Sequence, residues 1–211
     1  MVFNLENLMP KQRKELDAVK RQEYSKYYAE TLPKFGYLRD ADNAESYDFL
    51  CRYFAEWYGA KQNECDYPRK GLFLFGEKGT GKTTAMKIFS GLFNIDIVPI
   101  EDFTIAFTCG KETAFWEFAN SFNGARLIID DVCNEREAKA YGNSIPLPEF
   151  FKRRETLWHD KGIHTFFTSN AKDRNEITKL YGDTITSRFL GSCDFVKFIG
   201  PDRRIARRNT I

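Results

Sequence analysis

The stretch "FLFGEKGTGKTTAMKIF", Phe73 to Phe89, changes character twice within a few residues. It opens with a short apolar run, passes through a glycine-rich loop, and continues with a helical pattern. Residues 76–83 match G-x-x-x-x-G-K-[ST] in full, with a strand expected before the loop and a helix after it, which is the context that the pattern requires. The stretch therefore predicts a phosphate-binding loop.

Each part of this loop has a chemical role. Glycines allow the backbone to curl so that successive N–H groups point at anionic oxygens, and the following helix adds its positive end. We expect Lys82 to reach the β- and γ-phosphates and the Thr83 hydroxyl to ligate Mg²⁺, so ATP and Mg²⁺ are the predicted cofactors. The residues predicted to bind the nucleotide are Gly76, Glu77, Lys78, Gly79, Thr80, Gly81, Lys82, Thr83 and Thr84.

After Pro68, short apolar runs alternate with helical patterns. The runs are "GLFLF" (71–75), "IDIVPI" (95–100), "RLIIDD" (126–131), "HTFFTSN" (164–170) and "DFVKFI" (194–199). Several are apolar at consecutive positions, which indicates strands buried on both faces, as in the centre of a parallel sheet. With helices between them, the runs predict a layered α/β fold.

An acidic pair ends one of these strands. "RLIIDDV" places Asp130 and Asp131 where a phosphate-loop protein needs carboxylates beside its metal. We expect Asp130 to support Mg²⁺ and Asp131 to polarise the attacking water as a general base. Because Asp131 is one methylene shorter than the usual glutamate, Glu135 is the alternative base.

The segment before the sheet is different in composition. Residues 1–42 are predicted to form a charged, helical N-terminal arm that could contact a partner, and residues 43–211 to form the ATPase domain. "KQRKELDAVKRQEYSKYYAETL" is read as a solvated helix, a helix docked on a partner or a mobile arm, because its apolar stripe is thin: Leu16, Val19 and Tyr27. "AESYDFLCRYFAEWYGA" predicts a packed helix with buried Tyr47, Leu50, Phe54 and Trp57.

Composition limits the functional classes. The 211 residues carry 32 basic and 30 acidic side chains, a balance that neither demands nor excludes a nucleic-acid partner. Five cysteines without a CxxC pair favour a reduced compartment and argue against structural zinc, and His159 and His164 lack ligand spacing. No window reaches about 18 apolar residues, so we expect a soluble, cytoplasmic protein without a membrane partner.

Polar residues recur after the later strands. "HTFFTSN" ends at Asn170, which could reach the γ-phosphate and orient water, "YGDTITSRFLG" carries Arg188, and "FIGPDRR" follows. The order of the phosphate loop, "LIIDDV", "YGN" (141–143), "FFTSN", "YGDTITSRF" and "GPDRR" resembles the AAA+ helicase-loader family. That family includes DnaC-type loaders of replicative helicases and IstB-type transposition helpers, and the resemblance covers roughly residues 45–205.

The resemblance implies an architecture. The expected fold is a P-loop NTPase of AAA+ type, with three layers around a central parallel five-stranded sheet and a short helical N-terminal extension. Only seven residues follow Arg204, so we expect no full lid domain.

The resemblance also implies roles and partners. Asn170 matches the sensor-1 position, and Arg188 matches the arginine finger that stabilises charge at a neighbouring subunit's nucleotide. Arg204 matches the sensor-2 position, with Arg203 as the alternative. The implied partners are further copies of the chain in a homo-oligomer, single-stranded DNA and a replicative helicase.

Two basic segments are candidates for DNA contact. "KRRETLWHDK" (152–161) places basic side chains beside Trp158, and "RRIARR" (203–208) carries four arginines. Basic groups attract phosphates and an exposed aromatic ring can stack a base, although both segments also fit ordinary solvated surfaces. We expect Lys152 and Arg153 near the surface of a helix whose core side contains Leu147, Phe150, Phe151 and Leu157.

The leading interpretation is an AAA+ ATPase that acts in DNA replication as a helicase-loader-like protein. An IstB-like transposition helper shares the domain and differs in its client. A nucleoside or small-molecule kinase predicts an acceptor substrate, activity as a monomer and indifference to DNA. A nucleotide-gated adaptor that does not hydrolyse ATP is supported only by the short side chain of Asp131.

Overall fold

The structure, a computed structural model, describes residues 10–62, 68, 70–134 and 145–206. The contacts within the chain separate it into two compact units, Met1–Arg69 and Lys70–Ile211. This division lies after the second helix rather than at residues 42 and 43, because that helix makes its contacts with the N-terminal helix.

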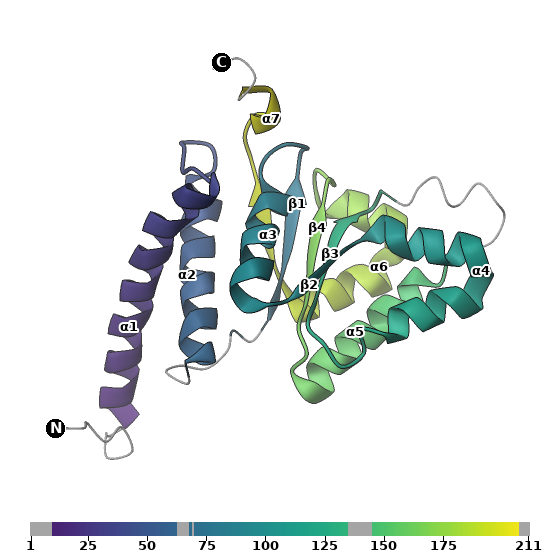
Figure 1. Ribbon diagram of the computed structural model, residues 1–211, viewed down its shortest axis with the longest axis horizontal. Helices are drawn as coiled ribbons and strands as arrows, with labels where there is room; N and C mark the ends of the chain where they lie inside the picture. The colour runs from purple at the N-terminus through teal and green to yellow at the C-terminus, as the bar shows by residue number, and fades with distance from the viewer. Residues whose placement is uncertain (1–9, 63–67, 69, 135–144, 207–211) are drawn as a thin grey trace. The chain divides into compact units, whose positions relative to one another are not determined.

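The first unit is a pair of helices. α1 (Pro10–Thr31) is followed by the short 3₁₀ helix η2 (Leu32–Phe35) and by α2 (Ala44–Lys61), which lies alongside α1 (Figure 1). Aromatic rings join the pair, with centroids 4.8 Å apart for Tyr24 and Tyr58 and 5.8 Å apart for Tyr28 and Phe54. The packed face of α2 is the predicted one: Tyr47, Leu50, Phe54 and Trp57 are all buried.

The predicted apolar stripe of α1 is wrong at two of its three positions. Val19 is 54% exposed and Tyr27 is 53% exposed, whereas Tyr28 and Leu32 are buried. Successive helical residues are separated by about 100° around the axis, so a shift of one position turns a side chain from one face to another. The buried face therefore follows Tyr24, Tyr28 and Leu32, and the side chain of Leu16 lies outside the described ones.

The second unit contains the predicted parallel five-stranded sheet. Its strands lie in the order β2-β3-β4-β1-β5, and all neighbouring pairs are parallel. Each expected strand is present with bounds that differ by no more than one residue, and Ile100 belongs to the following helix rather than to β2. The strands are β1 (Gly71–Gly76), β2 (Asp96–Pro99), β3 (Leu127–Val132), β4 (Thr165–Ser169) and β5 (Cys193–Phe198).

Helices cover both faces of this sheet (Figure 1). The helices are α3 (Lys82–Phe93), α4 (Ile100–Asn120), α5 (Leu147–Lys161), α6 (Arg174–Ser192) and the short α7 (Arg203–Ala206). Two adjacent residues of β4 show the layering, since neighbouring strand residues point to opposite faces. The ring of Phe166 packs against Phe89 of α3, and the ring of Phe167 packs against Phe151 of α5 and Phe189 of α6.

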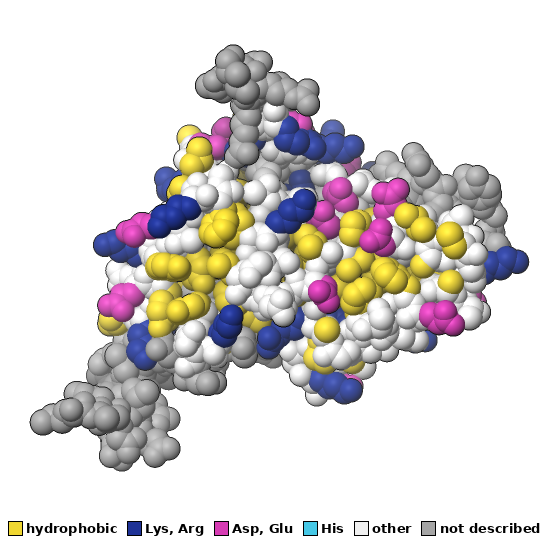
Figure 2. Space-filling view, in the orientation of Figure 1, with side chains coloured by type: hydrophobic (Ala, Val, Ile, Leu, Met, Phe, Trp, Pro, Cys, Tyr) yellow, Lys and Arg dark blue, Asp and Glu magenta, His cyan; other side chains and the backbone are white. Residues whose placement is uncertain are grey.

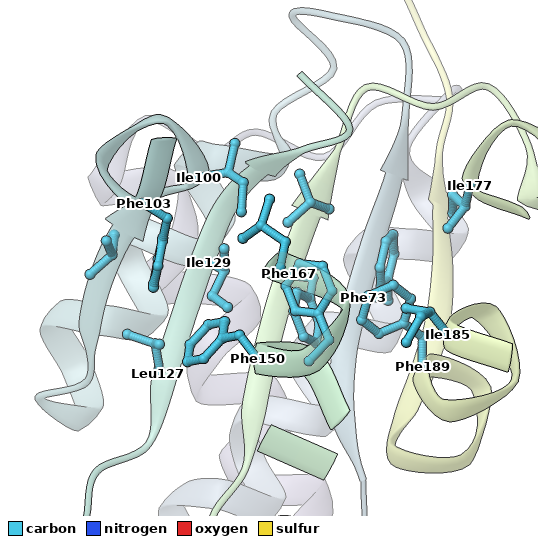
Figure 3. Packing of buried hydrophobic residues seen from close by; sticks show 14 of the residues in the cluster. Phe73, Ile100, Phe103, Leu127, Ile129, Phe150, Phe167, Ile177, Ile185 and Phe189 are labelled. Atoms are coloured by element: carbon cyan, nitrogen blue, oxygen red, sulfur yellow. The ribbon is translucent and has the colours of Figure 1, made fainter. Parts of the chain in front are cut away.

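Aromatic side chains fill the interface between the sheet and the helices α4, α5 and α6 (Figure 3). Phe73 of β1 lies between Phe167 and Phe195, with ring centroids 5.5 and 4.6 Å away. Phe150 of α5 reaches Phe103 of α4 at 4.9 Å. This dense packing keeps the strands in register, so the loops after their carboxyl ends start from a fixed edge. Among the described residues, no helix combines the length and the apolar character needed to cross a membrane.

Candidate functional site

The phosphate loop connects the end of β1 to the start of α3. Gly76 and Gly79 adopt φ values of 136° and 76°, which side chains with a Cβ rarely tolerate. Space also excludes a Cβ there: it would lie 2.1 Å from the Phe198 carbonyl oxygen at Gly76 and 1.9 Å from Asp202 Oδ1 at Gly79. The loop thus curls closely against β5 and the turn that follows it. Among the residues predicted to bind nucleotide, Glu77, Lys78 and Thr84 are exposed around it.

Lys82 lies beneath the loop, 4% exposed. Its ammonium group donates hydrogen bonds to the carbonyl oxygens of Gly76 at 2.8 Å and Glu77 at 2.7 Å. Burial lowers the pKa of Lys82 to about 8, and the charges of Asp131 and Asp130 offset part of this effect. The lysine therefore holds the loop's own carbonyl groups, in a position from which it can turn to an anionic ligand.

The loop meets the acidic pair through Thr83. The Thr83 hydroxyl donates to Asp130 Oδ1 at 3.0 Å, although the two residues are 47 positions apart in the chain. β1 and β3 are not adjacent in the sheet, since β4 lies between them. Ligands of open parallel sheets bind beyond the carboxyl ends of the strands, at the edge where these two side chains meet.

Asp131 lies beside Asn170. The Asn170 amide donates to Asp131 Oδ1 at 2.8 Å. Burial is the main cause that raises the pKa of Asp131 above its ordinary value, followed by the charge of Asp130, while the Asn170 hydrogen bond lowers it. A carboxylate with a raised pKa next to an amide that orients it is suited to accepting a proton from water.

One residue of this cluster was missed by the motif reasoning. Thr168 is fully buried, and its hydroxyl donates to Asp130 Oδ1 at 2.5 Å and accepts from the Asp131 backbone N–H at 2.9 Å. It is the first residue of "TSN", near the end of β4 and two positions before Asn170, which follows the strand. The polar segment "TSN" after an apolar strand was the sequence signal that could have pointed to Thr168.

The "GPDRR" turn packs on the phosphate loop through Arg203, the alternative to Arg204 at the predicted sensor-2 position. Arg203 donates from its backbone N–H to the Gly79 carbonyl at 3.0 Å and from its guanidinium to the Thr80 carbonyl at 2.9 Å. Arg204 instead pairs with Asp202 through two hydrogen bonds of 3.0 and 2.9 Å, and its side chain is 69% exposed. Arg203 is therefore the residue that contacts the loop, and Arg204 lies beside it with its charge facing solvent.

Arg188 is not part of this cluster in the folded chain. Its guanidinium pairs with Glu155 of α5 at 2.5 Å, and the two side chains are 37% and 23% exposed. They line a cavity with Arg154, Trp158 and Ser192. Ser192 is the last residue of α6, immediately before β5 begins, so Arg188 lies toward the amino ends of the strands. The phosphate loop is at the other end.

The predicted DNA-contacting helix is only partly basic at its surface. Lys152 and Arg153 lie near Glu149, at 3.7 and 3.9 Å, and the Arg153 guanidinium lies 3.8 Å from the ring centre of Trp116. Trp158 and Leu157 are half-buried rather than fully exposed or fully buried. Leu147, Phe150 and Phe151 are buried as predicted, and the core side also contains Arg154, which was not predicted.

Several predicted residues lie outside the described ranges. These are the alternative base Glu135, the "YGN" motif and the last arginines of "RRIARR". His159 is exposed and His164 is buried, and no group of three or more metal-ligating side chains occurs among the residues that the structure describes. Mg²⁺ does not require such a group, because it typically uses one or two protein ligands together with phosphate and water oxygens. The neighbouring Thr83 hydroxyl and Asp130 carboxylate fit that pattern.

The fold is similar to those of two solved structures. One is the crystal structure of the DnaC helicase loader, with 15% identity, a TM-score of 0.52, and coverage of 76% of this chain and 92% of that chain. The other is the crystal structure of DnaI, with 20% identity, a TM-score of 0.55, and coverage of 77% and 87%. No protein-family model matches the sequence, and no curated protein sequence matches it either.

These likenesses confirm the predicted fold class. The chain has an α/β fold built on a five-stranded parallel sheet, and it shares this fold with the two solved structures. At these identities the likeness is one of fold, and at that level the predicted resemblance to DnaC-type helicase loaders is confirmed.

Proposed function

We propose that this protein is a Mg²⁺-dependent ATPase that acts in DNA replication in the manner of a helicase loader. The observation that carries the proposal is the meeting of Thr83 with Asp130 and of Asn170 with Asp131, beside a loop closed around Lys82. This arrangement occurs at the carboxyl edge of a fold shared with the DnaC helicase loader.

The binding step follows from the loop. Backbone N–H groups of residues 76–84 and the start of α3 would hold the phosphates. Lys82 would exchange the carbonyl oxygens of Gly76 and Glu77 for the β- and γ-phosphate oxygens. Thr83 and Asp130 would hold Mg²⁺, which when bound neutralises charge on those phosphates. Arg204, exposed beside the loop, would add positive charge there.

The hydrolytic step needs a base and an orienting group. In the proposed mechanism Asp131 accepts a proton from water as the water oxygen attacks the γ-phosphorus, and the bond to the ADP oxygen breaks. Asn170 keeps the Asp131 carboxylate oriented through its amide hydrogen bond. The raised pKa of Asp131 makes its carboxylate a better proton acceptor than an ordinary aspartate.

The homo-oligomer is proposed from the position of Arg188. Because Arg188 is paired with Glu155 toward the opposite end of the sheet, it is not placed to reach the phosphates of its own chain. An arginine that contributes from a second copy would stabilise the charge that develops on the transferred phosphoryl group. The active form would then be an assembly in which each nucleotide lies between two copies.

Single-stranded DNA and a replicative helicase are the proposed partners. Figure 2 shows acidic side chains among hydrophobic ones over α4, where Glu101 and Asp102 are exposed, so that face does not favour phosphates. Better candidates for contact with DNA are Lys152, whose side chain is 42% exposed, and Arg204, whose side chain is 69% exposed. Binding of this kind would be governed by charge and would weaken steeply with salt.

The decisive experiment measures ATP hydrolysis with and without single-stranded DNA. The proteins are wild type, Lys82→Ala, Arg188→Ala and an equimolar mixture of the two variants. The proposal expects both variants to be inactive alone and the mixture to regain activity, because an intact site can form from Lys82 of one copy and Arg188 of another. Full activity of Arg188→Ala, or activity of a monomer that ignores DNA, would contradict it and direct attention to phosphate transfer to an acceptor.

A further inference from the structure

The two strands that carry the acidic pair and Asn170 do not remain in regular register. Ile129 of β3 pairs with Phe167 of β4, but Val132 pairs with Ser169. Two residues of β3, Asp130 and Asp131, are therefore opposite the single residue Thr168 of β4. This is a β-bulge, which leaves the extra residue without its regular ladder partner.

The bulge explains how two consecutive acids can serve one site. In a regular strand neighbouring side chains point to opposite faces, so Asp130 and Asp131 would separate. At the bulge Asp131 has a φ of 62°, in the left-handed region, and both carboxylates remain near the phosphate loop. Asp130 contacts Thr83, and Asp131 contacts Asn170. The bulge is therefore part of the geometry of the site.

A single hydroxyl group connects both acids at this point. Thr168 Oγ1 donates its proton to Asp130 Oδ1 at 2.5 Å and accepts the backbone N–H of Asp131 at 2.9 Å. A hydroxyl has one proton to donate and lone pairs to accept, so both capacities are used. The Asp131 N–H would otherwise lack the partner that the ladder normally supplies. Thr168 is fully buried, so water does not readily replace its hydroxyl.

The adjacent residue supports the same bulge by a separate route. The Ser169 hydroxyl donates to the Val132 carbonyl at 2.9 Å and accepts the Ala171 N–H at 3.1 Å. It touches neither acid. Loss of the Thr168 hydroxyl would therefore leave the end of the bulge tied to β4 while releasing the Asp130 side chain and the Asp131 backbone.

We propose that Thr168 is a positioning residue for the acidic pair: its hydroxyl keeps the Asp130 carboxylate directed at the metal position and Asp131 in its left-handed conformation. The proposal rests on the Mg²⁺–nucleotide function proposed above and assigns to Thr168 a part of the metal affinity. Residues that orient metal ligands typically contribute 10- to 100-fold to that affinity.

The test measures binding of a fluorescent ATP analogue as a function of Mg²⁺ concentration. Thr168→Val removes the hydroxyl and retains the shape, Thr168→Ser restores the hydroxyl, and Thr168→Cys supplies a weak donor if the valine variant does not fold. The matched control is Thr165→Val, which removes a buried hydroxyl from the amino end of the same strand, where it accepts from Arg154. Hydrolysis is not required for this measurement.

We expect the Mg²⁺ concentration at half-saturation to rise about tenfold or more in Thr168→Val, to rise less in Thr168→Cys, and to remain within about twofold of wild type in Thr168→Ser and Thr165→Val. An unchanged midpoint in Thr168→Val overturns the proposal. An equal rise in Thr168→Ser and Thr168→Val also overturns it, because the Mg²⁺ affinity would then not depend on the hydroxyl.

The two proposals can fail separately. If wild type binds the analogue without any dependence on Mg²⁺, the proposed function fails, and the role of Thr168 fails with it. If wild type depends on Mg²⁺ and the Thr168 and Thr165 valine variants do not differ from it, the proposed function stands and only the positioning role is rejected.

Discussion

The two ends of the sheet in the Lys70–Ile211 unit satisfy their polar side chains in different ways. At the carboxyl end, Asp130 and Asp131 are held by hydrogen bonds from Thr83, Thr168 and Asn170, yet both remain partly exposed beside the phosphate loop. At the amino end, Arg154 is buried among aromatic side chains and hydrogen-bonded within the chain, and the partly exposed Arg188 is paired with Glu155. The carboxyl end therefore retains capacity for a ligand, and the amino end uses its polar groups for packing.

Arg154 is an example of a buried charged group at the amino end of the sheet that is hydrogen-bonded within the chain. It is 1% exposed and has no acidic partner among the described hydrogen bonds; instead it donates to the Thr165 hydroxyl and to the carbonyl oxygens of Phe122, Ala125 and His164. One buried guanidinium thus joins the loop after α4 to the start of β4. Arg188, to which the family resemblance assigned a catalytic role, lies in this region rather than beside the nucleotide loop.

The largest expected effects distinguish nucleotide binding, which depends on Lys82 at the carboxyl end of the sheet, from hydrolysis, which also depends on Arg188 at the amino end. Lys82→Ala should weaken nucleotide binding by at least about 100-fold, because in the proposed complex the lysine would contact the phosphates directly. Arg188→Ala should bind nucleotide within about threefold of wild type and lose about 10³-fold in turnover, the scale for an arginine finger. Equilibrium binding and steady-state hydrolysis measure the two quantities. Lys87→Ala, an exposed lysine further along α3, is the control and should resemble wild type.

A second comparison removes one carboxylate from each end. Asp131→Asn should lower turnover by about 10² to 10⁴-fold with nucleotide binding retained, because an amide cannot accept the water proton. Glu155→Gln should retain turnover within about fivefold and lower the free energy of unfolding by about 1 kcal/mol, the scale of a partly exposed ion pair. Hydrolysis assays and urea unfolding measure these effects. Equal losses of turnover in the two variants would abolish the distinction between the ends.

The third prediction concerns stability alone. Arg154→Met should lower the free energy of unfolding by about 3 kcal/mol, because it removes the donor to the Thr165 hydroxyl and to the Phe122 and Ala125 carbonyls. Lys152→Met, on the same helix but 42% exposed, should change it by no more than about 0.5 kcal/mol. Denaturant unfolding provides both values, and nucleotide binding at temperatures below the transition should be unaffected in each. Similar stability of the two variants would contradict the structural role of Arg154.

The smallest expected effect is a change in the labelling rate of two cysteines, one at each end of the sheet. Cys193, at the start of β5, is buried, and burial raises its pKa to about 12; its thiolate is therefore scarce at pH 8 and its labelling should be slow. Cys133 follows the acidic pair and is half-buried, so it should react faster, and bound Mg²⁺–ATP should slow it several-fold. Peptide mapping by mass spectrometry after a thiol reagent reports each site. If bound Mg²⁺–ATP slowed the labelling of Cys193 instead of Cys133, the nucleotide would bind at the amino end of the sheet, and the proposed site would be wrong.

Much of this molecule was predictable because the relevant signals are local. The strands follow from consecutive apolar residues, and the phosphate loop follows from eight residues between a strand and a helix. The acidic pair and Asn170 were predictable as neighbours, since parallel strands bring their carboxyl ends to one edge. The family resemblance added Arg188 and the sensor-2 arginine, whose local sequence alone would read as ordinary surface arginines.

What the sequence by itself determined is the fold class and the set of groups at the carboxyl edge. Only the tertiary structure decided which neighbours those groups have: Tyr28 rather than Tyr27 on the packed face of α1, Arg203 rather than Arg204 against the loop, and Thr168 between the two acids. The physical reason is that side-chain partners depend on helix rotation, strand register and a single bulge. Each of these is set by packing between segments far apart in the chain, and a shift of one residue changes every partner.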